Sequence, residues 1–527
     1  MKRSIHTLLA LVLVCSVQAQ PTFEKFYQSG SSYTLDVIEL PGHNLLTCMA
    51  ATHVINPEGY IVHSSSYREG GTYYTQSLDA AGPNRFYFTT ATLATECTNG
   101  ALSLINPVIG KMDSLGTTAG MRRYAFETGP CYNPLGGLNV TNDLGAITWG
   151  REKNFFALRV EEDLAPVWAK RIVRSGGFQF IKELPGGDLL AGINMDTAGA
   201  VIARLDPGGN FIWCKSYIRP RGVVHDALVE SDDSFIITGC TDSTTLDIFH
   251  PLPPNYQPKL FMMKLNGDGA VQWCRGYNSA PHCWHVSTSS RIERTLDGNY
   301  AILATLGTPE YNFEFRPLLM KTDINGDTLW THSIGRNGYR YMTSDLASLT
   351  DGGLLFSGLI FGDLPGGNSG LPYIYKSDAN GHLPCWERVH AIQTLDLFPV
   401  DSAFTLVTED ILTTATPVLV VDTTLQPFTV YDGCTFTTGI PDQRRSRPKP
   451  AVRPNPTPGR FTVEFQDPLV KDTYYSVYDT MGKLLFQRAA AHGKRTEEVD
   501  LTGYSTGTYV IRFTDPEGVC YERVVVE

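Results

Sequence analysis

The sequence predicts an all-β protein in which repeated β-meanders form most of the chain and a small β-sandwich follows them. Three observations support this prediction. A phrase that joins an apolar strand, a Gly-containing turn and a Trp returns along the chain. The 49 Gly residues and the low charged fraction of 18% favour short strands and many turns. Beyond residue 450, short segments with period-two alternation follow a basic, Pro-rich stretch.

The N-terminus, residues 1–19, has the three parts of a secretory signal peptide. It begins with basic residues, continues with the apolar run Leu8–Val14 and ends in small residues before Gln20. Because a bilayer-spanning helix needs about 20 apolar residues, this run is too short to remain as an anchor. We therefore expect cleavage between Ala19 and Gln20 and export of the remainder.

The overall charge and hydropathy limit the classes of partner. The formal net charge is -11 at pH 7, which argues against a nucleic-acid partner. No later stretch reaches a membrane-spanning length without Gly, Pro or a charged residue, so we predict no transmembrane segment.

The repeated phrase predicts one β-hairpin per unit. An apolar strand leads to an Asp/Asn-x-x-Gly turn, and a second strand carries an aromatic anchor. Upstream strands such as Phe178–Glu183 complete a meander of four strands. The anchors at the end of each copy are Trp168, Trp213, Trp273, Trp330 and Trp386.

A meander of four short strands cannot cover both of its own faces, so neighbouring copies have to cover each other. Closure into a ring leaves only short, protected edges, and repeats of this length match propeller blades. We predict a seven- or eight-bladed β-propeller over residues 20–435, with the five Trp residues packed between blades. We count eight units, the last including Leu395–Tyr431, with divisions near residues 72, 122, 174, 221, 286, 339 and 391. The count is seven if one outer unit is only a closing strand.

The spacing of Asp206, Gly209 and Trp213 recurs in later copies, and it resembles the quinoprotein-type propeller repeat. That resemblance implies a quinone cofactor held with calcium, often beside a disulfide between adjacent cysteines. The chain contains no adjacent Cys pair and no evident cofactor-binding cluster, so we predict no cofactor.

Two short stretches offer metal ligands, and for each we prefer a simpler explanation. Asp323–Asp327 resembles a calcium loop, but Thr328 stands where an EF-hand needs Gly, and a polar hairpin tip explains the same residues. Pro281–His285 holds two His and one Cys but has no second ligand pair at zinc-finger spacing. We predict no metal site.

Ten cysteines remain after loss of the signal peptide, and export makes disulfides possible. Their connectivity cannot be derived from the sequence. We favour a disulfide at Cys283, and we expect Cys520 to be a free, buried thiol.

The C-terminal part is predicted to be a separate domain. Residues 436–453 form a basic, Pro-rich linker, and period-two strands follow over residues 454–527. This segment resembles the type A C-terminal sorting domain of the type IX secretion system in the following motif residues, which occur in order: Pro454, Asn455, Pro456, Gly459, Gly482, Gly507 and Tyr509. The resemblance implies a Bacteroidetes-type exporter, the type IX machinery as a partner, and a protein that is secreted or held at the outer cell surface.

The sequence predicts the function of the main body only coarsely. We expect a non-catalytic scaffold that binds a glycan or an extracellular protein, and we predict no catalytic residues. The alternative is a glycan-active hydrolase or lyase, with carboxylates from different blades meeting at the central channel. Two or more convergent carboxylates with perturbed ionisation would favour the enzyme.

Overall fold

The computed structural model describes most of the chain as two compact units, which divide between Phe436 and Thr437. The described residues are 22–28, 36–49, 51–68, 74–94, 103–126, 133–151, 155–173, 176–195, 199–217, 222–241, 260–279, 290–308, 314–362, 370–419, 421–424, 429–434, 451–465, 468, 474–479, 484–490, 492–515 and 518–527. All regular structure within these ranges is β, and none of it is a helix that could cross a bilayer.

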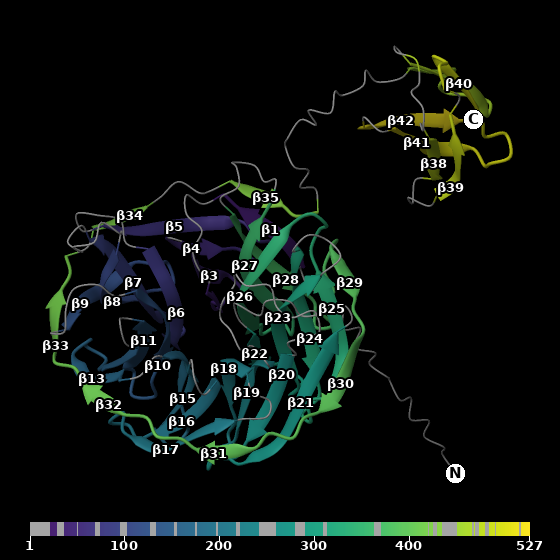
Figure 1. Ribbon diagram of the computed structural model, residues 1–527. Coiled ribbons are helices and arrows are strands. Elements are labelled where there is room, and N and C mark those ends of the chain that lie inside the picture. Colours follow the sequence, from purple (N-terminus) through teal and green to yellow (C-terminus); the bar gives the residue numbers. More distant parts are fainter. Residues whose placement is uncertain are drawn as a thin grey trace, which may run out of the picture. The chain divides into compact units, whose positions relative to one another are not determined.

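The first unit contains seven antiparallel sheets of five strands each, and Figure 1 shows them arranged around an open centre. Sheet 1 consists of β2 (Val37–Glu39), β3 (Leu45–Cys48), β4 (Thr52–Ile55), β5 (Ile61–Arg68) and an outer strand. Sheet 2 consists of β6 (Tyr74–Gly82), β7 (Arg85–Ala94), β8 (Ser103–Met112), β9 (Thr118–Phe126) and an outer strand. Sheet 3 consists of β10 (Asn133–Val140), β11 (Ala146–Arg151), β12 (Phe155–Val160), β13 (Pro166–Ile172) and an outer strand.

The next three sheets repeat this order. Sheet 4 consists of β14 (Gly176–Glu183), β15 (Leu189–Met195), β16 (Gly199–Leu205), β17 (Phe211–Tyr217) and an outer strand. Sheet 5 consists of β18 (Gly222–Val229), β19 (Phe235–Thr241), β20 (Leu260–Leu265), β21 (Val271–Ser279) and an outer strand. Sheet 6 consists of β22 (Arg291–Arg294), β23 (Tyr300–Thr308), β24 (Glu314–Thr322), β25 (Thr328–Ile334) and an outer strand.

Sheet 7 joins the two ends of this series. It contains β26 (Arg340–Ser348), β27 (Leu354–Phe361) and β28 (Leu371–Ser377), and its fourth strand is β1 (Phe23–Tyr27) from the N-terminal end. Because β1 pairs with β28 in register from Phe23 opposite Lys376 onwards, the last sheet is completed by the first strand of the chain. The arrangement is propeller-like.

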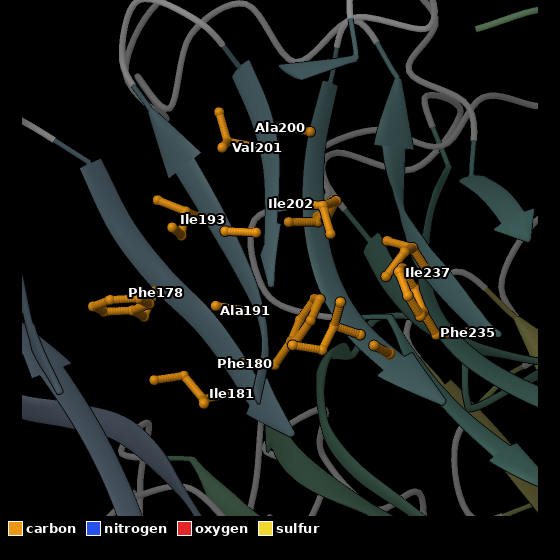
Figure 2. Close-up of a cluster of buried hydrophobic side chains, with 14 of the residues drawn as sticks. Phe178, Phe180, Ile181, Ala191, Ile193, Ala200, Val201, Ile202, Phe235 and Ile237 are labelled. Atoms are coloured by element: carbon orange, nitrogen blue, oxygen red, sulfur yellow. The ribbon is translucent and has the colours of Figure 1, made fainter. Parts of the chain in front are cut away.

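Apolar side chains fill the space between neighbouring sheets. Figure 2 shows one such cluster, in which Phe178 and Phe180 of β14 lie near Ile193 and Ile202, and Phe235 of sheet 5 approaches from the other side. The strand β15 is buried at six of its seven positions, which explains its nearly continuous apolar sequence. Burial of both faces of the middle strands stabilises the ring through apolar area removed from water.

The fifth strand of every sheet comes from one segment, residues 387–432, which we call the belt. Its strands are β29 (Glu387–Val389), β30 (Ile392–Asp396), β31 (Asp401–Ala403), β32 (Thr408–Asp410), β33 (Thr413–Pro417), β34 (Val421–Thr424) and β35 (Val430–Asp432). They join sheets 6, 5, 4, 3, 2, 1 and 7 in that order. In Figure 1 these green strands follow the rim once around the ring. The belt therefore covers the outer strand edge of each sheet, which would otherwise expose unpaired backbone groups.

The belt has a repeat of its own, with a period of seven residues. Every seventh belt residue lies opposite one residue of the next fourth strand. The pairs are Glu387 with Ile334, Thr394 with Tyr277, Asp401 with Tyr217, Thr408 with Ile172, Ala415 with Tyr124, and Asp422 with Tyr67. The last step, to Val430 opposite Tyr27, is one residue longer. Each sheet thus receives a strand of three to five residues followed by a short connection.

Charge complementarity accompanies the pairing of the belt with the ring. In each of five ion pairs the acid lies on the belt and the base lies on a fourth strand: Asp396 with Arg275, Asp401 with Lys215, Glu409 with Arg171, Asp410 with Lys170, and Asp432 with Lys25.

The predicted eighth unit is wrong. Residues 395–431 do not form a strand–turn–strand unit of their own, because their short strands are shared among six sheets. The predicted division near residue 122 is also wrong, since that residue lies inside β9. The division near residue 391 is wrong as well, since it falls between two belt strands, β29 and β30. The remaining five divisions, near residues 72, 174, 221, 286 and 339, fall between the last strand of one sheet and the first strand of the next.

The second unit contains two antiparallel sheets with a common apolar core. One sheet has the order β36 (Ala451–Arg453), β37 (Arg460–Glu464) and β40 (Thr496–Asp500). The other has the order β39 (Leu484–Ala489), β38 (Tyr474–Asp479), β41 (Gly507–Asp515) and β42 (Gly518–Val526). Residues of both sheets, including Val463, Val477 and Ile511, are fully buried in one cluster. Since β36 pairs with β37, regular structure begins three residues before the predicted start of this domain.

Candidate functional site in the central channel

The innermost strands of all seven sheets line a central cavity of about 440 Å³. Its wall is rich in ionisable side chains, which come from six different sheets: Asp36, Asp79, Lys182, Asp226, Arg291, Glu293 and Asp345. The remaining sheet, sheet 3, contributes Asn139. A cavity of this volume falls within the range of small-molecule sites, and five carboxyl groups against two cations make its formal charge negative.

Most of these side chains connect one sheet to the next. Five of them accept a hydrogen bond from a backbone N–H group of the neighbouring innermost strand: Asp345 from Val37 at 3.0 Å, Asp36 from Leu78 at 3.0 Å, Asp79 from Val140 at 2.6 Å, Asn139 from Glu183 at 3.2 Å, and Asp226 from Ile292 at 3.2 Å. The remaining two steps use the cations. Lys182 Nζ lies 3.5 Å from Asp226 Oδ1, and Arg291 Nε donates to the Ser344 carbonyl at 2.9 Å. Together these contacts pass once around the ring.

Glu293 stands outside this circle of contacts. It follows Arg291 by two positions on β22, so both side chains face the channel. Within the described part of the chain, no hydrogen bond or ion pair engages its carboxyl group. Burial raises the pKa of Glu293 to about 8, the nearby Lys182 opposes this rise, and the carboxylates of Asp226 and Asp345 add to it. Glu293 is therefore mostly protonated at neutral pH and able to donate a proton.

Other carboxyl groups of the channel also hold protons more tightly than usual. Burial, followed by repulsion from Asp36, raises the pKa of Asp345 to about 7. Burial raises the pKa of Asp36 and of Asp79 as well, although hydrogen bonds from Ser77 and from backbone N–H groups counteract it. The channel thus holds convergent carboxyl groups with perturbed ionisation.

The Trp residues of the repeat lie at contacts between neighbouring sheets. Four of these indoles are half-buried, and each lies against the turn Gly of the following sheet. The pairs are Trp168 with Gly209, Trp213 with Gly269, Trp273 with Gly326, and Trp330 with Gly381. The Gly269 backbone has a φ of +73°, and a Cβ there would lie 2.7 Å from the Trp213 ring. The indole N–H of Trp213 donates to the Gly267 carbonyl at 3.1 Å. The Trp of one copy therefore packs against the Gly of the next copy.

Trp386 lies in a different place from the other four. Its copy of the phrase begins on β28, but sheet 7 takes its fourth strand from β1, so Trp386 lies immediately before the belt. Its indole N–H donates to the Gly433 carbonyl at 2.8 Å.

A second contact between sheets was missed by the sequence analysis. On five of the fourth strands, a buried Tyr hydroxyl donates to a turn carbonyl of the next sheet: Tyr27 to Gly59, Tyr67 to Gly116, Tyr124 to Leu164, Tyr217 to Gly269, and Tyr277 to Gly326. In sheet 6, Nδ1 of His332 lies 3.0 Å from the Gly381 carbonyl. The signal in the sequence was an aromatic residue four positions after Trp213 and Trp273.

One His-containing cluster offers possible metal ligands. His332, His382 and Glu387 each place one possible ligand atom within 4.8 Å of the others. The two imidazole rings are stacked, with centroids 5.2 Å apart and planes at 29°. Because a ring nitrogen binds a metal in the plane of its ring, nearly parallel stacked rings do not direct their nitrogens to one point. His382 instead pairs with Glu387 at 2.8 Å, which raises the pKa of His382.

The stretch Asp323–Asp327, which was expected to be a polar hairpin tip, forms the turn between β24 and β25. Asp323 Oδ1 accepts the backbone N–H groups of Asn325 and Asp327 at 2.9 and 2.8 Å, so this carboxylate serves its own turn. Several other predictions fall outside the described residues: the cleavage site at Ala19 and Gln20, the ligands in Pro281–His285 and the Gly482 motif position. Nothing is described of the Cys520 side chain.

The motif residues of the second unit tie its termini together. Asn455 Nδ2 donates to the Arg523 carbonyl at 2.7 Å, and its Oδ1 accepts the Val525 N–H at 2.9 Å. A Cβ at Gly459 would lie 2.9 Å from the backbone of Thr502. The hydroxyl of Tyr509 donates to the Ser505 carbonyl within the same unit. Pro454 and Pro456 lie beside Asn455, and Gly507 opens β41.

Comparison with family models assigns this second unit. Residues 451–527 match the secretion system C-terminal sorting domain. The sorting domain marks the chain for export by the type IX system and for a location at the cell surface or outside the cell. The match confirms the resemblance of the C-terminal motifs and leaves the body unassigned.

Other comparisons add little about the body. A search of curated proteins found no match. Among solved structures, a protein of unknown function from Bacteroides caccae is similar, with 10% sequence identity and a TM-score of 0.32. The alignment covers 59% of this chain and 93% of that chain. A likeness of this size does not bear on function.

Proposed function

We propose that the chain is an exported protein, displayed at the cell surface or released, whose body is a closed seven-bladed β-propeller that binds a small cationic ligand in its channel. Two findings support the propeller: the seven five-stranded sheets and the completion of sheet 7 by β1. The sorting domain supports the location.

The observation that favours a cationic ligand is the convergence of five carboxyl groups on one cavity. They come from different sheets, and the two cations among them are already engaged with Asp226 and with the Ser344 carbonyl. A ligand that bears an amino group and further hydrogen-bonding groups, such as an amino sugar or a short polyamine, would complement this wall. Its ammonium group would replace the protons that the channel carboxyls retain near neutral pH.

Binding is tested with the full chain by calorimetry, using glucosamine, N-acetylglucosamine and glucose at one ionic strength. Acetylation removes the charge of the amine and leaves the ring in place, so we expect glucosamine to bind at least tenfold more tightly than the other two. Putrescine should compete with it. A Glu293→Gln variant keeps the shape of the site and should weaken amine binding. Equal or absent binding of the three sugars contradicts the proposal.

A second candidate is acid–base cleavage of glycans, and Glu293 is the observation that favours it. Its protonated carboxyl lies in the same cavity as carboxyl groups that accept backbone hydrogen bonds, which gives an acid and candidate bases in one site. Reducing-end release from a glycan panel tests this function. Activity that Glu293→Gln abolishes would establish it, and activity that survives in Glu293→Gln would assign the cleavage elsewhere.

A further inference from the structure

A disulfide closes the belt into a hoop. Cys385 lies just before β29 and Cys434 just after β35, and the two are bonded across a sequence separation of 49 residues. The segment between them passes every sheet once (Figure 1). The chain from Cys385 to Cys434 is thus a covalently closed loop around the ring, and cleavage of the S–S bond opens it without breaking the backbone.

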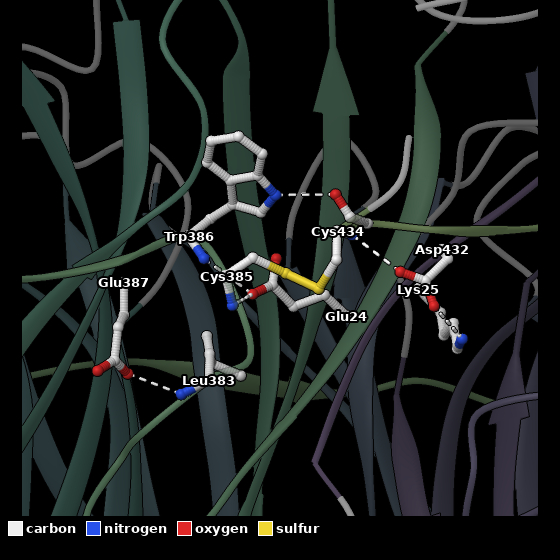
Figure 3. Close-up of a disulfide and its surroundings, with 9 residues drawn as sticks. Glu24, Lys25, Leu383, Cys385, Trp386, Glu387, Asp432 and Cys434 are labelled. Atoms are coloured by element: carbon white, nitrogen blue, oxygen red, sulfur yellow. Dashed lines mark hydrogen bonds and ion pairs between the residues drawn. A yellow bond between two sulfur atoms is a disulfide. The ribbon is translucent and has the colours of Figure 1, made fainter. Parts of the chain in front are cut away.

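Glu24 of β1 lies against both ends of this loop. Its carboxyl Oε1 accepts the backbone N–H groups of Cys385 and Trp386, each at 3.0 Å (Figure 3). Its backbone carbonyl accepts the Gly433 N–H at 2.7 Å. A Cβ at Gly433 would lie 2.8 Å from that of Glu24, so the two segments are in close contact.

The second carboxyl oxygen of Glu24 has no such partner. Oε2 is buried without a hydrogen bond, and the residue as a whole is 1% exposed. A carboxyl oxygen of Glu24 lies within 4.8 Å of both sulfur atoms. A buried carboxyl oxygen without a partner is costly, and cleavage of the adjacent S–S bond would produce a thiolate that can take a proton from it.

We propose that the Cys385–Cys434 disulfide is a thiol-exchange site that locks and unlocks the belt, with Glu24 as the proton donor. A small external thiolate attacks Sγ of the exposed Cys434, and the S–S bond breaks. Cys385 leaves as a thiolate and takes the proton from Glu24. A second external thiolate then attacks the mixed disulfide and releases Cys434. Two external thiols become one disulfide, and the protein disulfide becomes two thiols.

The surroundings of Glu24 keep that proton available near neutral pH. Burial raises the pKa of Glu24 to about 7, against the two backbone N–H groups that favour the anion, and the acids Asp432 and Glu387 add to the rise. Three further groups face this region: Lys25 pairs with Asp432 at 2.8 Å, and the buried Tyr341 and Tyr375 interact with Glu24 electrostatically.

The experiment measures the rate at which dithiothreitol reduces the disulfide in the full chain. Dividing this rate by the concentration of dithiothreitol thiolate gives a rate constant per thiolate. A disulfide without an internal acid gives a rate constant that does not change with pH. With Glu24 as donor, the constant should fall about tenfold from one pH unit below 7 to one unit above, following the protonated fraction. A flat wild-type profile overturns the proposal whatever any variant does.

Two variants separate proton donation from packing. Glu24→Gln can still accept the two N–H groups but has no acidic proton, so its profile should be flat and slower at low pH. Asp432→Asn alters a charge beside the disulfide and should keep the fall of the rate constant with pH. If this fall persists in Glu24→Gln, the proposal is contradicted.

Hydrogen exchange tests the unlocking itself. After complete reduction and alkylation, peptides within residues 387–432 should lose protection, while β15 and β19 in the middle of their sheets should keep it. Full protection of the belt after reduction would show that the disulfide does not lock it.

Discussion

The channel wall and the rim of the ring both carry one charged or polar group from nearly every sheet, but they use these groups differently. In the channel, the carboxyl groups of Asp36, Asp79 and Asp345 accept backbone N–H groups of the adjacent sheet, and burial raises their pKa values. At the rim, the acids of the belt are in contact with water and pair with bases of the fourth strands, as in Lys170–Asp410, where the Asp410 side chain is 82% exposed.

The difference shows which interactions hold each region. The buried carboxyl groups make the stability of the channel sensitive to pH, because a carboxylate that is removed from water is costly to ionise. Exposed ion pairs contribute little free energy at the rim, so the belt depends on main-chain pairing, apolar anchors and its disulfide. The buried Ile411 and Val418 are such anchors, and they lie one belt period apart.

The largest expected effect is loss of the covalent closure. A Cys385→Ser/Cys434→Ser double variant should lower the free energy of unfolding by about 4 kcal/mol, the loop-closure entropy of a segment with a sequence separation of 49. Denaturant unfolding measures this change. Cys214→Ser, which removes a thiol that forms no disulfide, is the control and should shift the midpoint much less.

A smaller effect is expected at the contact between sheets 4 and 5. Trp213→Ala removes a half-buried indole from Gly269 and should cost about 2 to 3 kcal/mol of unfolding free energy. Tyr217→Phe removes only the hydroxyl that donates to the same Gly269 and should cost about 1 to 2 kcal/mol. Thermal unfolding compares them, and a larger effect of Tyr217→Phe would mean that hydrogen bonding dominates this contact.

The pH dependence of stability distinguishes the channel from the rim. The pKa of Glu293 is raised from 4.5 to about 8, so its contribution is fully present below pH 4.5 and is lost as the pH rises through 8. Glu293→Gln should therefore flatten the fall in unfolding free energy over this window. If the slope is unchanged, the Glu293 carboxyl is not the group that resists ionisation.

The smallest expected effect concerns the rim charges. Asp410→Asn breaks the exposed pair with Lys170 and should change the unfolding free energy by about 0.5 kcal/mol or less. Chemical unfolding at low and high salt measures it. A loss of several kcal/mol would show that the belt relies on its ion pairs after all.

The sequence predicted features that repeat within one sheet and missed those that need the whole ring. The hairpin ending at Trp213 was visible because its strand, turn and anchor are contiguous. The belt was misjudged because strands of three residues, such as Asp401–Ala403, carry no detectable periodicity, and their partners lie far away in sequence. The channel could not be assembled for a similar reason. Its groups, Asp36 and Glu293 among them, lie on separate strands, and only the ring brings them into one cavity.

The C-terminal prediction succeeded for the opposite reason. The predicted period-two strands correspond to β37 to β42, and the motif residues from Pro454 to Tyr509 lie within 55 positions of one another. Contacts such as Asn455 with β42 are encoded by short motifs in a fixed order. A compact module with local signatures can be recognised from sequence where a distributed site cannot.

Because each sheet takes one seven-residue period of the belt, the length of the belt and the number of sheets have to change together. In a chain of repeated sheets, each sheet contacts mainly its neighbours, so a repeat can be gained or lost without altering the others. Here an added sheet would leave the belt too short to reach every sheet and would separate Cys385 from Cys434. The number of sheets can change only if about seven codons are gained or lost in the belt at the same time.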